Sequence, residues 1–171
     1  GCWRAHLSTL LNAASLPFDF VGTLSGPTNC GIPFDADHEG HSGFKATGIV
    51  GNDTFLPSWL RATRPDVVMM LLGTNDVWGG GITAEEILKA YEGLVGDMRT
   101  ENDDMRILIA QLPPMRPSNC ADCYERVKEL NRAIMAWVPG QSTPRSRITV
   151  VDAWTPFNTT EDMRDGVHPN E

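Results

Sequence analysis

The chain has 171 residues, a length that predicts one domain with one hydrophobic core. Hydrophobic residues make up 41% of it, which excludes disorder of the whole chain, and no apolar stretch approaches the roughly 20 residues that a membrane-spanning helix needs. The formal net charge is −8, and because an acidic surface repels phosphate, we expect neither nucleic acid nor an anionic membrane as a partner.

The N-terminal part of the chain predicts a helix, a strand and a long loop. Apolar residues recur at helical spacing over residues 3–14, and Pro17 ends this helix. Residues 18–24 have the composition of a strand. The polar segment 25–52 is rich in Gly, Asp and His, and a loop of that length in a compact domain is usually functional.

The rest of the chain alternates helices and strands. A short helix is predicted over 54–63, and Thr83 with Glu86 forms a capping box at the start of a longer one. Three apolar runs predict parallel strands, the first buried on both faces: 67–72, 105–112 and 147–153. Amphipathic helices lie between them: 83–100 and 122–138. This alternation predicts an α/β fold with its site in the loops at the carboxyl ends of the strands.

The cysteines favour a secreted protein. There are four of them: Cys2, Cys30, Cys120 and Cys123. Three pairings are possible, and we favour a local structural disulfide between Cys120 and Cys123. Two glycosylation sequons begin at Asn52 and Asn158. Paired cysteines and sequons together lead us to expect an extracellular location.

Asp165 and His168 are the first candidate catalytic residues. They lie three residues apart on a short turn, so both side chains can face one cleft. A carboxylate that holds a neighbouring imidazole is the orienting half of a hydrolase triad. By itself, the motif fits a solvated turn with a capping Asp equally well.

Two further residues could stabilise an oxyanion. Asn75 follows the apolar run 67–72, and its side-chain amide could donate to developing negative charge. Alternatively, Asn75 and Asp76 form a turn with local hydrogen bonds. Gly43 could offer its backbone N–H, because a glycine allows close approach of the backbone, although a glycine in a glycine-rich loop is a weak signal.

Taken together and in this order, three segments resemble the SGNH (GDSL-type) hydrolases: Gly40-His41-Ser42-Gly43-Phe44, Gly73-Thr74-Asn75-Asp76 and Asp165-Gly166-Val167-His168-Pro169-Asn170. That family has a Gly-Asp-Ser block, a lone Gly, a Gly-x-Asn block and a C-terminal Asp-x-x-His. The resemblance covers essentially the whole chain, and within the family it is strongest to carbohydrate esterase family three, the acetylxylan esterases.

The resemblance implies a fold and a set of roles. The fold would be a flavodoxin-like three-layer sandwich with a central parallel sheet, forming one domain over residues 1–171. His168 would be the general base and then the general acid, and Asp165 would orient it. The Gly43 N–H and the Asn75 amide would form the oxyanion hole, and no cofactor is implied.

One family block is absent from the chain. No serine follows a Gly-Asp pair, and Ser42 is rejected as the nucleophile because a loop, not a strand, precedes it. We therefore expect the nucleophilic Ser upstream of Gly1. The first strand of the family fold and a helix after His168 are expected to be missing too, so that the domain is truncated at both ends.

The expected function is that of a secreted, monomeric serine esterase that removes acetyl groups from plant cell-wall polysaccharide. Trp78 is a candidate for stacking on a sugar, with a core or lid role as its alternative. The acidic and His-rich segment 35–41 has metal-ligand residue types, but bare acidic loops are far commoner than sites, so we expect no metal. A lipid esterase or thioesterase, or a non-catalytic carbohydrate-binding remnant, are the alternative functions.

Overall fold

The computed structural model describes residues 2–79 and 81–170 and is built around a three-stranded parallel sheet. The strands follow chain order: β3 (Val67–Met70), β4 (Arg106–Ala110) and β5 (Ile148–Val151). Val67 pairs with Arg106, and Ile107 with Ile148. The three apolar runs therefore form parallel strands, as predicted.

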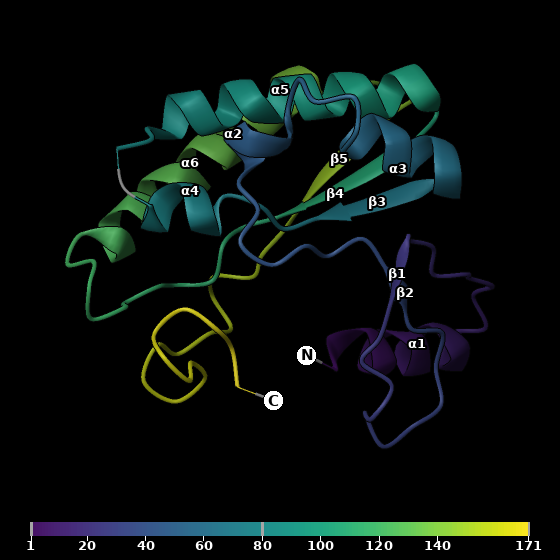
Figure 1. Cartoon of the computed structure of the whole chain (residues 1–171), viewed down its shortest axis with the longest axis horizontal. Helices are drawn as coiled ribbons and strands as arrows, with labels where there is room; N and C mark the ends of the chain where they lie inside the picture. The colour runs from purple at the N-terminus through teal and green to yellow at the C-terminus, as the bar shows by residue number, and fades with distance from the viewer. Residues whose placement is uncertain (1, 80, 171) are drawn as a thin grey trace.

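Helices cover one face of this sheet (Figure 1). The two crossovers are α5 (Ala84–Glu101) and α6 (Cys123–Gln141), and they pack against each other. Both lie on the same face because the chain steps through the sheet in one direction with right-handed connections. Three shorter helices lie on the same side: α2 (Ala46–Ile49), α3 (Leu56–Thr63) and α4 (Thr74–Trp78).

The hydrophobic core fills the space between the sheet and these helices. Ile107 and Ile109 of β4 are fully buried, and Tyr91 of α5 is buried with its hydroxyl donating to the Leu72 carbonyl at 2.8 Å. The buried Asn131 of α6 accepts from Leu112 N at 2.8 Å and donates to Leu112 O at 2.9 Å, which satisfies the backbone where β4 ends. The predicted capping box of Thr83 and Glu86 is confirmed.

The prediction of a strand over residues 18–24 is wrong. Only Leu24 and Ser25 form a short strand, β1 (Leu24–Ser25), which pairs antiparallel with β2 (Asp37–His38) outside the main sheet. The backbone of the preceding residues bonds to side chains instead. Phe20 N donates to the Asp35 carboxylate and Thr23 N to the Glu39 carboxylate, both at 2.8 Å. These carboxylates take the place of a neighbouring strand.

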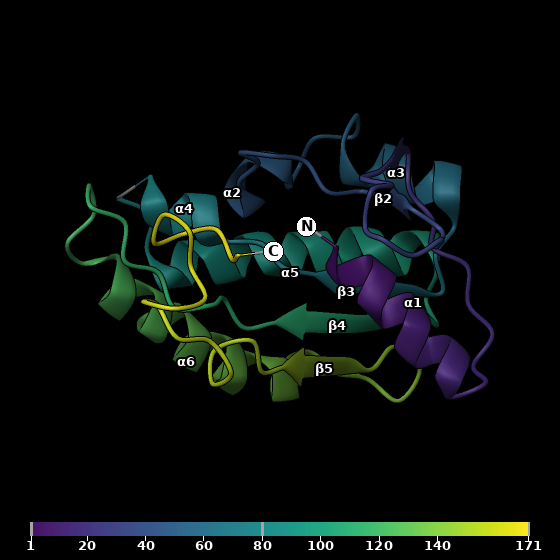
Figure 2. The same ribbon diagram turned by 90° about the horizontal axis from the view of Figure 1, so that it is seen from below.

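The opposite face of the sheet is open along β3, which corrects the prediction of a strand buried on both faces. Val67, Met69 and Leu71 are 48%, 49% and 52% exposed. The helix α1 (Trp3–Ala13) lies on this side (Figures 1 and 2). It is fastened to the β1–β2 region, since Cys2 is bonded to Cys30 and Arg4 donates to the Gly26 carbonyl. The alternation of strand residues thus buries only the face toward α5 and α6.

The four cysteines form two disulfides, one local and one between residues 28 positions apart. The pair Cys120–Cys123 forms as favoured from the sequence, and Cys2–Cys30 is the second bond, with Cα–Cα distances of 5.4 and 5.5 Å. Within the described residues, no helix is long and apolar enough to cross a membrane.

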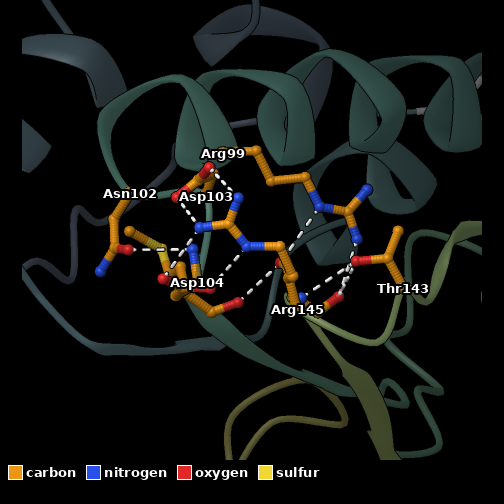
Figure 3. A network of polar contacts seen from close by, with 8 residues as sticks. Arg99, Asn102, Asp103, Asp104, Thr143 and Arg145 are labelled. Carbon is orange, nitrogen blue, oxygen red and sulfur yellow. Dashed lines mark hydrogen bonds and ion pairs between the residues drawn. The ribbon is translucent and has the colours of Figure 1, made fainter.

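A polar network joins the end of α5 to the start of β5 (Figure 3). Arg99 donates to the carbonyls of Gln141 and Ser146 at 2.7 and 3.0 Å and to the Ser146 hydroxyl at 3.1 Å. Ser146 is buried, and its hydroxyl donates to the Met105 carbonyl at 2.6 Å. Nearby, the exposed Arg145 pairs with Asp103 and Asp104 at 2.7 and 2.9 Å.

The two arginines of this network differ in what they stabilise. Replacing Arg99 removes the charged donor to the part-buried Gln141 carbonyl and to the buried Ser146 hydroxyl, whereas the Ser146 carbonyl keeps Thr143 N as a donor at 3.2 Å. Arg99→Met should therefore lower the free energy of unfolding by about 1–3 kcal/mol. Arg145→Gln is the matched control, and it should leave the urea midpoint unchanged because its ion pairs are exposed. Equal losses in urea denaturation for the two variants would contradict this assignment.

Candidate active site

Asp165 and His168 form a hydrogen-bonded pair on the C-terminal loop. Asp165 Oδ2 lies 2.8 Å from His168 Nδ1. Asp165 Oδ1 accepts two backbone N–H groups, from Val167 at 3.0 Å and from His168 at 2.8 Å. The three bonds fix the carboxylate and the imidazole on one turn, with both side chains about half exposed. The spacing seen in the sequence thus does bring the two side chains together.

The backbone hydrogen bonds of His168 and Val167, together with the His168 ring, hold the pKa of Asp165 far below its ordinary value of 3.8. The carboxylate is therefore ionised throughout the neutral range. Facing an ionised acceptor, His168 Nδ1 carries the hydrogen that it donates, which leaves Nε2 of the neutral ring with a free lone pair. The pair can therefore accept a proton at Nε2.

The turn is fastened to the loop that follows β4. Arg116 N donates to the Gly166 carbonyl at 2.7 Å. Gly166 has φ +80°, and a Cβ there would collide with the Arg116 carbonyl, so the close approach requires glycine. Met163 and Pro169 form a bridge that closes the turn. These contacts thus hold the loop that carries His168 in position.

Asn75 and Gly43 lie on neighbouring segments. Asn75 is in the first turn of α4, directly after the carboxyl end of β3, and its Nδ2 donates to the Phe44 carbonyl at 2.9 Å. An amide NH₂ has two hydrogens, so one can still donate to another acceptor. Gly43, next to Phe44, has φ +80°. One hydrogen bond therefore joins the two segments that carry the candidate oxyanion donors.

The buried Asp76 holds these two segments together. Its carboxylate accepts from Ala46 N at 2.8 Å, Thr47 N at 3.1 Å and Thr47 Oγ1 at 2.7 Å. The side chain thereby caps the N-terminus of α2, which starts two residues after Phe44. Sequence reasoning missed this role because the amide donors lie about thirty positions upstream of the carboxylate.

Trp78 links α4 to His168. The two ring centroids are 6.4 Å apart in an edge-on arrangement, and Trp78 Nε1 donates to Asn119 Oδ1 at 2.9 Å. The structure therefore places Trp78 beside the Asp165–His168 pair, and Asn75 lies on the same short helix as Trp78, three residues earlier. Their catalytic and binding roles stay predictions.

The acidic and His-rich segment 35–41 serves the local fold. Besides Phe20 N, the Asp35 carboxylate accepts Asp37 N at 3.1 Å. Glu39 accepts the Thr23 hydroxyl at 2.8 Å and lies 2.6 Å from His41 Nε2. The His41 ring stacks on Trp59 at 4.3 Å. These side chains are thus engaged with protein groups.

Comparison with known proteins defines the class. The model of the GDSL-like Lipase/Acylhydrolase family matches residues 26–171, and the chain belongs to this family of esterases and acylhydrolases. A "Multidomain esterase" of Ruminococcus flavefaciens is 22% identical over 152 residues, which cover 81% of this chain. The chain spans 19% of the length of that relative.

The solved structures narrow the resemblance to carbohydrate esterase family 3. A family 3 carbohydrate esterase from Talaromyces cellulolyticus is 33% identical, with a TM-score of 0.89, and the match covers 99% of this chain and 82% of that one. The same values hold for a serine-to-alanine variant of an acetyl esterase described with an acetate ion. The fold is therefore the SGNH α/β fold of these esterases, as the sequence motifs indicated.

An acid titration tests the hydrogen bonds that lower the pKa of Asp165. The amide proton shifts of Val167 and His168 should follow the ionisation of Asp165, because both N–H groups donate to it. Because the pKa of Asp165 is lower in the folded than in the unfolded state, the ionised carboxylate stabilises the turn fully at pH values above the unfolded-state pKa of about 3.9. This stabilisation is lost as the pH falls through the folded-state pKa. An NMR titration should give a midpoint below 3.8.

Asp165→Asn is the matched control, and its two amide signals should not titrate over this range. A midpoint at or above 3.8 in the unsubstituted protein would contradict the hydrogen-bonding arrangement.

Proposed function

We propose that the protein is a secreted, monomeric serine esterase that removes O-acetyl groups from plant cell-wall polysaccharide of the xylan type. The observation that carries the proposal is the exposed Asp165–His168 pair, with Nδ1 and Oδ2 2.8 Å apart, beside Trp78 of the helix that also carries Asn75. The similarity to a carbohydrate esterase and to an acetyl esterase described with acetate supports acetyl as the group that is removed. The two disulfides support an extracellular location.

The chemistry would pass through an acyl-enzyme. The serine hydroxyl attacks the acetyl carbonyl while His168 Nε2 takes its proton, and the sugar hydroxyl leaves with that proton. Water then attacks the acetyl-serine and gives a proton to Nε2, which passes it to the serine oxygen as the bond to the acetyl group breaks; the acetic acid released ionises to acetate. The Gly43 N–H and the Asn75 amide would stabilise the oxyanion in both steps, and Asp165 would stabilise the imidazolium.

The nucleophile in this proposal is a Ser that precedes Gly1 in the parent protein. Two features of the molecule favour that place. The start of α1 and the C-terminal loop lie near each other in both views (Figures 1 and 2), so a segment before α1 would start close to that loop. β3 is also an edge strand of the described sheet, so its free edge could pair with a strand that would carry such a serine into position.

The exposure of the pair favours a polysaccharide over a lipid substrate. The side chains of His168 and Asp165 are 55% and 46% exposed, so a bulky polymer could reach them. An acyl chain instead needs an enclosed apolar channel to remove its surface from water. Trp78, edge-on to His168, would contact the sugar that carries the ester.

Esterase assays on the full-length protein test the proposal. It should hydrolyse p-nitrophenyl acetate faster than longer acyl esters, and His168→Ala should lower kcat by about 10²–10⁴-fold through loss of the general base. Arg145→Gln, remote from the site, is the control. Near-normal rates for His168→Ala would refute its role as the general base. A preference for long acyl chains would refute acetyl esters as the substrate.

The oxyanion role of Asn75 predicts a separate kinetic signature. Asn75→Ala should lower kcat about 10²–10³-fold with little change in KM, because the amide would bind charge that exists only in the transition state. Thr47→Val, which removes one hydroxyl bond to Asp76, is the control for loosening of this region. A rise in KM at constant kcat would assign Asn75 to substrate binding instead.

A further inference from the structure

A shallow depression of about 370 Å³ lies between the loop after β4 and the loop after β5, outside the residues assigned above. Its wall is formed by eight residues: Pro114, Arg116, Tyr124, Trp154, Thr155, Phe157, Asn158 and Thr159. The volume lies within the range of small-molecule sites. Aromatic and hydroxyl side chains in one open depression suit a pyranose ring, which has apolar faces and a polar rim.

The aromatic part of the wall is half-buried and packed. The rings of Tyr124 and Trp154 lie 5.1 Å apart and are tilted by 48°. The loop that carries Trp154 is held by Asp152, whose carboxylate accepts Trp154 N at 2.9 Å and Thr155 N at 2.8 Å. Tyr124 follows Cys123, which is bonded to Cys120. The aromatic surface is therefore held in place before any ligand arrives.

Arg116 supplies the charge of this depression. The carbon of its guanidinium lies 3.7 Å from the centre of the Tyr124 ring, a cation–π contact, and Arg116 is exposed, so its N–H groups can reach a ligand. Among the described residues, Arg116 has no carboxylate partner, whereas Lys128 on the same ring is paired with Glu125 at 3.0 Å. In a protein of net charge −8, this makes the depression a local site for an anion.

The depression is tied to the candidate catalytic turn through backbone. Arg116 N donates to the Gly166 carbonyl, two residues before His168. Asn119 of the same loop accepts from Trp78. A polymer with one sugar at His168 could extend across this loop, and its neighbouring units would then meet Arg116 and Trp154.

We propose that the depression is a binding subsite for a pyranose unit that bears a carboxylate, a uronic acid unit of the polysaccharide. This rests on the proposed function and names the substrate class more narrowly. The ring would stack on Trp154, and the carboxylate would accept two N–H bonds from the Arg116 fork. The enzyme would thus act preferentially near acidic branches of its substrate.

Binding of acetyl-free oligosaccharides tests the subsite without requiring turnover. Full-length protein from a host that does not attach N-glycans is used, because the sequon residue Asn158 lines the depression. Calorimetric titration with a uronic acid-substituted xylo-oligosaccharide should give an affinity at least about tenfold above that for the neutral oligosaccharide of equal length.

Two substitutions separate the charge from the aromatic surface. Arg116→Gln should abolish the preference for the acidic ligand, and Trp154→Ala should weaken both ligands, with Trp154→Phe restoring part of the loss. Arg132→Gln, an exposed arginine of α6, is the charge-matched control and should keep the preference. Equal affinity for the two ligands, no binding of either, or a preference that survives Arg116→Gln would overturn the proposal.

The outcome is separable from the esterase test. His168→Ala should bind both oligosaccharides as the unsubstituted protein does. A protein without esterase activity that keeps the acidic preference would refute the proposed function and leave the subsite standing. An active esterase without the preference would refute the subsite alone.

Discussion

The arrangement of the candidate site depends on the buried carboxylate of Asp76. A buried carboxylate is costly unless its oxygens are satisfied, and here two backbone N–H groups and one hydroxyl of residues 46 and 47 satisfy them. The interaction forces the segment after Gly43 against the helix that carries Asn75. The distance between the two candidate oxyanion donors is thus set by a third residue that faces away from solvent.

Asp165 uses the same chemistry in an exposed setting. Its oxygens also accept two backbone N–H groups, but the third partner is the His168 ring. The backbone bonds hold the carboxylate ionised, and an ionised carboxylate in turn fixes the hydrogen on Nδ1. Asp76 therefore holds two backbone segments together, whereas Asp165 determines which nitrogen of the His168 ring carries the hydrogen.

Local signals predicted those features whose partners lie close in sequence. The Thr83 capping box, the Cys120–Cys123 disulfide and the Asp165–His168 pair each join residues three positions apart. The failures involve distant partners. Residues 18–24 are strand-like in composition, but Asp35 and Glu39 take up the backbone of Phe20 and Thr23. The burial of Met69 depends on what covers the sheet, which an apolar run cannot show.

The carboxyl edge of the sheet explains why one loop can serve several parts of the site. The segments after β3, β4 and β5 carry Asn75, Arg116 and His168 in that order, and parallel strands deliver all three to one edge. The middle segment touches both neighbours, at Trp78 through Asn119 and at Gly166 through Arg116 N. A change in the loop after β4 would therefore move Trp78 and the Asp165–His168 turn together, so that the two parts of the candidate site are coupled through this loop.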